Sequence, residues 1–343
     1  RVTRLEGSNP SLSVCRTPDT AGRRLPLRRS IMSPRMPVLL GLAIAAAACG
    51  GAANNGRPAA APPPGNVGSG AWLAATGSCM PLPALDSAGL LTDVFRLADD
   101  SMRGRHIGSP EGAKARDYLA ARFDAVGLET IGGSRLHRVP VIPSARLNDI
   151  DHAFNVVGMV RGTEFPERYI VVTAHFDHVG VGRAVDGDSI YNGADDNASG
   201  SAALVALARH FGQHPARHSI VFAAVDGEER GMWGARGFIE APTVPLENIM
   251  INVNMDMVGR NAANELYAAG PGRYPQLKPI VERITPCAPV VLKMGHDTDA
   301  AGPGNDWTMQ SDHGQFHRQG IPFLYFGVED HPDYHRPSDH PDH

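Results

Sequence analysis

The chain has 343 residues, and 42% of them are hydrophobic, which is enough for one large core or two small ones. Its formal net charge at pH 7 is −4, but the charge is spread unevenly along the chain. Residues 1–48 contain eight Arg against Glu6 and Asp19, a balance of +6, so the remainder carries about −10. An acidic remainder of this kind disfavours nucleic acid as a partner.

The N-terminal segment is typical of an export signal. Arg35 precedes an apolar run that is too short to span a bilayer, and small residues lead from this run into Cys49. The layout resembles a bacterial lipoprotein signal, in which the cysteine becomes acylated. An ordinary signal peptide with an incidental cysteine is the alternative. We therefore expect a signal peptide over 32–48 and a flexible tether, rich in Gly, Ala and Pro, over 49–75.

This layout predicts where the protein goes. We expect an exported protein, either a periplasmic or outer-membrane-anchored lipoprotein that meets the membrane only through Cys49, or otherwise a secreted one. Residues 1–31 lack an initiator Met and any hydrophobic period, and are expected to be a disordered upstream extension. An oxidising compartment permits Cys79 and Cys287 to pair, although two lone cysteines do not establish a disulfide.

The folded part, residues 76–343, alternates between helical and strand patterns. Apolar residues recur at helical spacing over 88–127, which predicts two helices there. Short apolar runs predict strands at 154–160, 169–174, 219–225 and 249–255, and helical candidates lie at 198–212, 232–240 and 274–285. This alternation predicts one α/β domain with a mainly parallel sheet whose strands are covered on both faces.

Polar residues of metal-binding types follow these strands, at the edge where open α/β sheets place their ligands. They are His175, Asp177, Asp195, Asp196, Glu228, Glu229, Asp256 and, near the C terminus, His335. Each alone is more often a helix cap or a satisfied polar residue than a ligand. Together, carboxylates and imidazoles at one end of a sheet would repel one another or lose solvation unless a cation neutralises them. Nitrogen and oxygen donors without thiolates favour zinc.

Five segments carry a resemblance to a known family. In chain order they are HFDH, DGDSIYNGADDNASG, DGEERGMWGARGF, NMDMVG and YHRPSD. They resemble the zinc peptidases of family M28, the aminopeptidase Y-like enzymes, from about Gly104 to Asp339. The resemblance implies a three-layer α/β/α sandwich with a mixed, mostly parallel sheet. It also implies a metal-dependent exopeptidase, most simply an aminopeptidase that acts on peptides.

The same resemblance implies a ligand set for two Zn2+ per chain. Asp196 would bridge both metals. His175 and Asp256 would complete one metal site, and Glu229 and His335 would complete the other. Two metals of this kind polarise a scissile carbonyl and make a hydroxide available near neutral pH.

Further roles follow for residues that would not bind metal. Glu228, next to one ligand, would be the general base that takes a proton from the water and delivers it to the leaving amine. Asp177 would orient His175, and Asp195 is left as a secondary or capping residue. In SDHGQF at 311–316, His313 is a candidate oxyanion stabiliser or substrate contact, with a plain loop histidine as the alternative.

Two other functions remain open. A glutaminyl cyclase of the same fold would use a single zinc, and a receptor-like relative would have lost catalysis. The DGEERG context and the glycine-rich segment before Asp195 resemble the hydrolases more, and all five expected ligands and the base are present. The chain ends eight residues after His335, where relatives usually continue with a further helix, so a truncated C terminus is expected.

Overall fold

The computed structural model describes residues 79, 85–139, 150, 153–302 and 304–342. The predicted extension, signal peptide, acylation site and tether, which occupy residues 1–75, lie outside this part of the chain. Among the described residues, no helix combines the length and the apolar character needed to cross a membrane.

An eight-stranded mixed sheet forms the centre of the described residues. Its strand order is β1-β2-β6-β3-β7-β10-β8-β9. The inner strands β6, β3, β7 and β10 run parallel to one another, as do β8 and β9, whereas β1 with β2, β2 with β6 and β10 with β8 are antiparallel. The strands are β1 (Leu136–Val139), β2 (Ala153–Val160), β3 (Phe165–His175), β6 (His218–Val225), β7 (Ile249–Met255), β8 (Glu265–Ala269), β9 (Val291–Met294) and β10 (Phe323–Gly327).

Helices cover both faces of this sheet. They are α1 (Ser87–Leu97), α2 (Pro110–Ala125), α3 (Gly200–Gln213), α4 (Trp233–Glu240), α5 (Lys278–Ile284) and α6 (His313–Arg318). Side chains of a strand alternate between faces, so neighbours on β6 enter different cores. Phe222 packs in one apolar cluster with Leu204 of α3. Val221 packs in another with Phe238 of α4. The predicted three-layer α/β/α fold with a mixed, mostly parallel sheet is confirmed.

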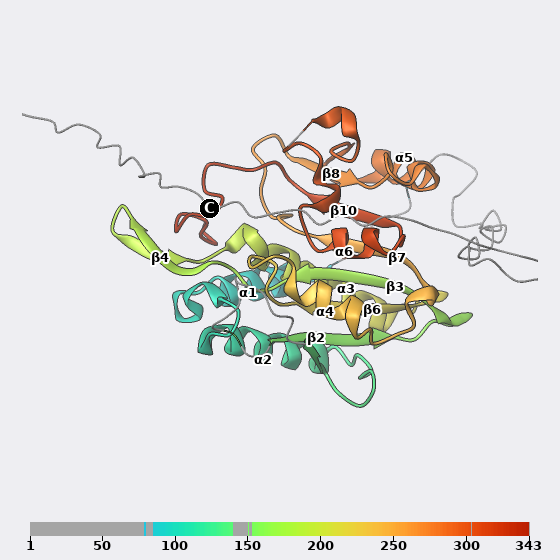
Figure 1. The fold of residues 1–343 in the computed structure, drawn as a ribbon, viewed down its shortest axis with the longest axis horizontal. Helices are drawn as coiled ribbons and strands as arrows, with labels where there is room; N and C mark the ends of the chain where they lie inside the picture. Colours follow the sequence, from blue (N-terminus) through green and yellow to red (C-terminus); the bar gives the residue numbers. More distant parts are fainter. Residues whose placement is uncertain (1–78, 80–84, 140–149, 151–152, 303, 343) are drawn as a thin grey trace, which may run out of the picture. The chain divides into compact units, whose positions relative to one another are not determined.

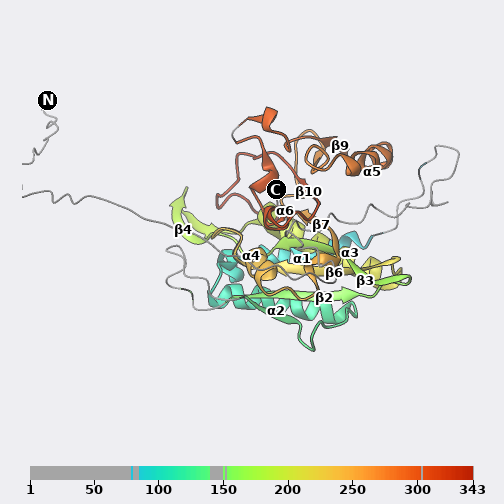
Figure 2. The ribbon, with the colours of Figure 1, turned by 45° about the vertical axis from the view of Figure 1, so that its right-hand side comes forward.

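Figures 1 and 2 show how the helices are distributed over the sheet. The helix α2 lies next to β2 at one edge, and α5 lies next to β8 and β9 at the opposite edge. Val281 of α5 packs against Leu292 of β9 and Leu324 of β10. Just beyond this helix, Cys287 forms a disulfide with Cys79, with 5.4 Å between the two Cα atoms.

The local sequence explains where these elements begin and turn. The two helices predicted over 88–127 are α1 and α2. The side chain of Asp86 accepts a hydrogen bond from the Gly89 amide at the start of α1, and Ser109 caps α2 ahead of a proline at its first turn. Between β4 (Gly180–Val185) and β5 (Asp188–Tyr191), Asp186 and Gly187 both have positive φ, as a tight two-residue hairpin turn requires.

The helix α3 should contribute strongly to stability through its buried face. Replacing Leu204, which is 0% exposed, by Ala should lower the free energy of unfolding by about 2–5 kcal/mol, because it leaves a cavity under the sheet. The matched change Leu91→Ala on α1, at a side chain that is 54% exposed, should cost no more than about 0.5 kcal/mol. Urea unfolding measures both variants. Equal losses would contradict the assigned layering.

Candidate metal centre

The candidate site lies where the parallel strands end. His175 is the last residue of β3, and Asp256 follows directly after β7. Glu228 and Glu229 lie in the turn after β6, before α4. Because β6, β3 and β7 are neighbouring parallel strands, their carboxyl ends bring these side chains to the same edge of the sheet.

Asp196 reaches the same edge from the loop that precedes α3. The side chains of Asn197 and Asp339 stabilise this loop through hydrogen bonds. The side-chain nitrogen Nδ2 of Asn197 donates to the Met255 carbonyl over 2.9 Å, and the side-chain oxygen Oδ1 accepts from the backbone amide of Met257 over 3.2 Å. Asn197 therefore ties the Asp196 loop to the end of β7, where Asp256 lies.

The C-terminal YHRPSD segment supplies the other support of that loop. The buried carboxylate of Asp339 accepts hydrogen bonds from the backbone amides of Asp195, over 3.0 and 3.1 Å, and of Asp196, over 3.0 Å. Asp195 itself accepts from the Gly259 amide over 2.7 Å and lies 3.2 Å from the imidazole of His331. Its contacts are those of a structural residue beside the site.

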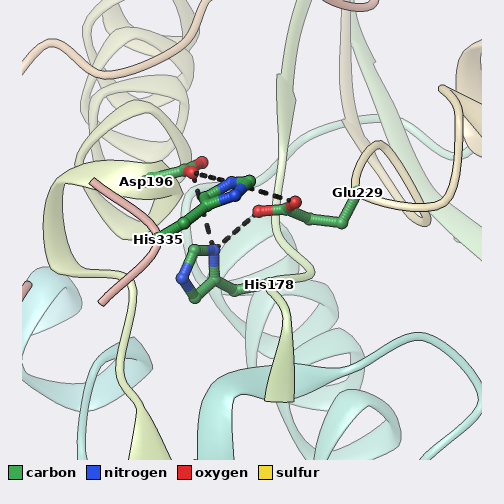
Figure 3. Close-up of side chains that lie close together, drawn as sticks. All are labelled: His178, Asp196, Glu229 and His335. Carbon is green, nitrogen blue, oxygen red and sulfur yellow. Dashed lines mark hydrogen bonds and ion pairs between the residues drawn. The ribbon is translucent and has the colours of Figure 1, made fainter. Parts of the chain in front are cut away.

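Two groups of donor atoms meet at Asp196. On one side, His175 Nε2 lies 3.3 Å from Asp196 Oδ1 and 3.1 Å from Asp256 Oδ1. On the other side, His335 Nε2 lies 3.1 Å from both Asp196 Oδ2 and Glu229 Oε2. Figure 3 shows the second group, with the side chains of His178, Asp196, Glu229 and His335 pointing toward one another.

The donor atoms within each group lie close enough to share one ion. The ligand atoms of His175, Asp196 and Asp256 are all within 4.8 Å of one another, and so are those of His178, Asp196, Glu229 and His335. Nitrogen and oxygen donors in this mixture, without a thiolate, are the set that zinc accepts. The structure thus brings together all five residues that the sequence resemblance names as ligands.

The electrostatics of the site fit a cation as well. Burial opposes charge on His335, but hydrogen bonds to Asp196 and Glu229 outweigh it and raise its pKa to about 10. Burial likewise opposes charge on His175, yet the charge of Asp256 and hydrogen bonds to the neighbouring carboxylates raise its pKa well above the ordinary value. Imidazolium thus balances the buried carboxylates in the metal-free protein. A divalent ion would take over that role and displace the protons.

Glu228 differs from these residues in its contacts. It is partly exposed, and its carboxyl forms no hydrogen bond or ion pair with any residue that the structure describes. Burial raises its pKa well above the ordinary value; the charge of His175 opposes this shift, whereas Asp256 and Asp312 add to it. Its backbone amide donates to Asp177 Oδ1 over 3.0 Å.

Asp177 contacts both His175 and the turn that carries Glu228. His175 Nδ1 lies 3.7 Å from the Asp177 carboxylate but nearer, at 3.2 Å, to the Asp177 backbone carbonyl. The carboxylate makes its shorter contact with the turn that carries Glu228. Asp177 therefore lies where it can position the ring and the turn together.

Among the described residues, His313 contacts none of these donor groups. It is fully buried at the start of α6, where Nε2 lies 2.8 Å from the Trp307 carbonyl and the ring packs on Phe323 and Tyr325. Burial lowers its pKa to about 3, so it is neutral. This environment favours packing, and its assignment as a substrate contact stays a prediction.

The preceding residue, Asp312, has the stronger electrostatic link to the site. Both of its carboxyl oxygens are buried, and neither has a hydrogen-bond partner in the described part of the chain. Burial raises its pKa to about 8; the charge of His175 opposes this shift, whereas Asp256 and Asp177 add to it. Within the SDHGQF segment, Asp312 is thus the residue whose pKa responds to the donor groups, and the role predicted for His313 stays a prediction.

Arg105 is a second residue whose role the sequence did not reveal. Its guanidinium is fully buried and donates to the backbone carbonyls of Phe176, over 2.7 Å, Asn192, over 2.6 Å, and Gly193, over 2.9 Å. Burial lowers its pKa only to about 10, so it remains charged. The guanidinium of Arg105 therefore connects the loop that follows His175 to the loop that leads to Asp196.

Comparison with known families identifies the chain. The profile of peptidase family M28 matches residues 155–343, which is more than half of the chain and includes every donor residue described above. The chain belongs to peptidase family M28.

Its relatives agree with that assignment. A probable zinc metalloprotease from Leptosphaeria maculans is 33% identical over 180 residues, which are 47% of this chain and 39% of that protein. A glutamate carboxypeptidase 2 homolog from Caenorhabditis briggsae is 37% identical over 117 residues, 32% of this chain and 14% of that protein. The chain thus matches less than half the length of these relatives.

Solved structures share the fold. A leucine aminopeptidase precursor from Bacteroides thetaiotaomicron has a TM-score of 0.61 at 20% identity, covering 77% of this chain and 93% of that chain. A zinc aminopeptidase from Bacillus subtilis has a TM-score of 0.58 at 16% identity, covering 76% and 91%. A Bacteroides thetaiotaomicron glutaminyl cyclase bound to N-acetylhistamine also reaches 0.58, at 19% identity, covering 76% and 92%.

Asp339 should be needed to hold the Asp196 loop even without metal. Replacing it by Ala leaves the buried amides of Asp195 and Asp196 unpaired, and each should cost about 1–3 kcal/mol of the free energy of unfolding. Asp339→Asn keeps one acceptor oxygen and should cost less. Urea unfolding in the presence of chelator measures both. An Ala variant as stable as the unmodified protein would disprove this support.

Proposed function

We propose that this protein is a zinc-dependent aminopeptidase with two zinc ions per chain. The observation that carries the proposal is the arrangement of Asp196, whose two carboxyl oxygens face different donor groups. Oδ1 lies 3.3 Å from His175 Nε2, and Oδ2 lies 3.1 Å from His335 Nε2. A carboxylate oriented in this way suits a bridge between two cations.

The residues divide naturally between two ions. His175 and Asp256 would hold one, Glu229 and His335 the other, and Asp196 both. When bound, zinc supplies Lewis-acid polarisation of a substrate carbonyl and a water that is acidic enough to act near neutral pH. Asp196 and Asp256 are buried, so their carboxylates have few alternative positions.

Glu228 is the residue best suited to move the proton. Its carboxyl is partly exposed and is not engaged by the described residues, unlike that of its neighbour Glu229, which His178 and His335 hold. It would accept a proton from the attacking water and return it to the amine that leaves. The hydrogen bond from its backbone to Asp177 keeps the turn next to His175.

Exopeptidase action and localisation are supported by less specific observations. Several solved structures with this fold are aminopeptidases, and the chain belongs to a peptidase family. We also propose export, because a disulfide between Cys79 and Cys287 suits an oxidising compartment. A free peptide is the proposed substrate.

A glutaminyl cyclase is the second candidate, since the Bacteroides thetaiotaomicron glutaminyl cyclase has this fold. A cyclase of this kind needs a single zinc. The group formed by His175, Asp196 and Asp256 offers a second cation a complete set of donors, and this favours the peptidase.

Metal content and substrate should separate these functions. We expect about two equivalents of zinc per chain by elemental analysis, release of the chromophore from aminoacyl p-nitroanilides, and no hydrolysis of the N-acetylated analogues, which lack the free amine. A chelator should abolish the activity and added zinc should restore it. One equivalent of zinc together with cyclisation of N-terminal glutamine would establish the cyclase instead, and hydrolysis unaffected by chelator would exclude a metal mechanism.

The two adjacent glutamates should fail in different ways. Glu228→Gln should keep its zinc and lose about 10²- to 10⁴-fold in kcat, the usual contribution of a general base. Glu229→Gln should weaken zinc binding itself, because it removes a charged donor next to His335. Zinc content and kcat, measured on the same preparations, test the division. If both variants lose metal, or neither does, the roles are wrong.

A further inference from the structure

His178 is a buried histidine of the site to which the sequence motifs assign no role. It follows Asp177 in HFDH, its side chain is 0% exposed, and Nδ1 lies 2.7 Å from Glu229 Oε1. The same nitrogen is 3.7 Å from Asp196 Oδ2, and the ring meets that of His335 edge-on, with 5.5 Å between the centroids (Figure 3).

The surroundings hold the ring in a single place. A Cβ at Gly193, whose φ is +61°, would lie 2.5 Å from Cγ and 2.6 Å from Cδ2 of His178, so only glycine leaves room for the imidazole. Gly193 is itself fixed, because its carbonyl accepts from Arg105 over 2.9 Å. The ring is thus held between the Asp196 loop and Glu229.

The hydrogen-bonding pattern determines which nitrogen carries the proton. An ionised carboxylate can only accept, so the short contact with Glu229 requires a proton on Nδ1 of His178. Nε2 is buried and has no hydrogen-bond partner among the residues that the structure describes. His178 Nδ1 lies within hydrogen-bonding distance of one carboxylate only, at 2.7 Å from Glu229 and 3.7 Å from Asp196. Nε2 of His335, by contrast, lies 3.1 Å from both carboxylates. The geometry therefore favours a donor to Glu229 over a ligand placed between two carboxylates.

We propose that His178 is a positioning residue: its Nδ1–H engages Glu229 Oε1 and thereby leaves Oε2, 3.1 Å from His335 Nε2, directed at the metal position. This inference rests on the proposed two-zinc site. Hydrogen bonds to ligating carboxylates orient the ligand, and losing one typically costs about 10- to 100-fold in metal affinity. Direct ligation by His178 is the alternative that the experiment must exclude.

Two polar substitutions separate these roles. The amide nitrogen of His178→Asn takes the place of Nδ1 and can still donate to Glu229, whereas in His178→Gln the longer side chain carries its amide nitrogen to the position of Nε2. Zinc affinity at each position is measured by chelator competition, and the ligands are identified by zinc-edge X-ray absorption. The Asn variant should bind zinc about as tightly as the unmodified protein. The Gln variant should lose about 10- to 100-fold at one of the two positions, with no change in the number of imidazole ligands.

The outcomes are distinct. If both variants lose affinity and one imidazole ligand, His178 is a ligand and the inference is overturned. If both bind zinc like the unmodified protein, the hydrogen bond has no effect, and the inference is likewise overturned. If the unmodified protein itself binds fewer than two zinc ions, the proposed function fails instead.

Controls guard against misfolding and nonspecific loss. The same Asn and Gln substitutions at His214, an exposed residue just after α3, should leave both zinc affinities unchanged. Thermal unfolding of all variants in chelator shows whether each is folded before metal is added. The position formed by His175 and Asp256 serves as an internal control. In the part of the chain that the structure describes, His178 contacts neither of these two residues, so the zinc affinity of that position should persist.

Discussion

Buried negative charge at one edge of a sheet is the constraint on which the rest of the site depends. Asp196, Glu229 and Asp256 come from three different loops, and each lies against an imidazole rather than a lysine or arginine side chain. Carboxylates held this closely destabilise one another unless positive charge lies between them. In the metal-free protein imidazolium supplies that charge, and two divalent ions would supply it better while leaving the histidines neutral.

The scaffold meets this constraint by tying the loops together with polar groups from distant parts of the chain. Arg105 holds the carbonyls that flank His175 and Asp196, Asp339 holds the amides of the Asp196 loop, and Asn197 joins that loop to β7. Each of these bonds joins a buried polar side chain to a backbone group of a loop or strand end at the site. The geometry of the donor atoms is therefore fixed by the protein before any ion binds.

The sequence predicted β2, β3, β6 and β7 and the layered fold, because short continuous apolar runs such as SIVFAAV suit strands that are covered on both faces. It did not predict β8 or β10, which have five residues each, or β1 and β9, which have four residues each and mixed burial. The five residues named as ligands lie together, and their role as ligands remains a prediction. The sequence did not predict the roles of Asp339 and Arg105, because they bind backbone groups that are 144 and 88 residues away in the chain. It did not predict the role of His178, because His178 and Glu229 come together only in the folded protein.

The central claim is that Asp196 holds two zinc ions, one with each of its oxygens. The most direct test is a crystal structure of the zinc-loaded protein with anomalous scattering recorded at the zinc edge. The account predicts two anomalous peaks, one bonded to Asp196 Oδ1 with His175 and Asp256, and one bonded to Asp196 Oδ2 with Glu229 and His335. A single peak, or two peaks that do not share Asp196, would contradict it.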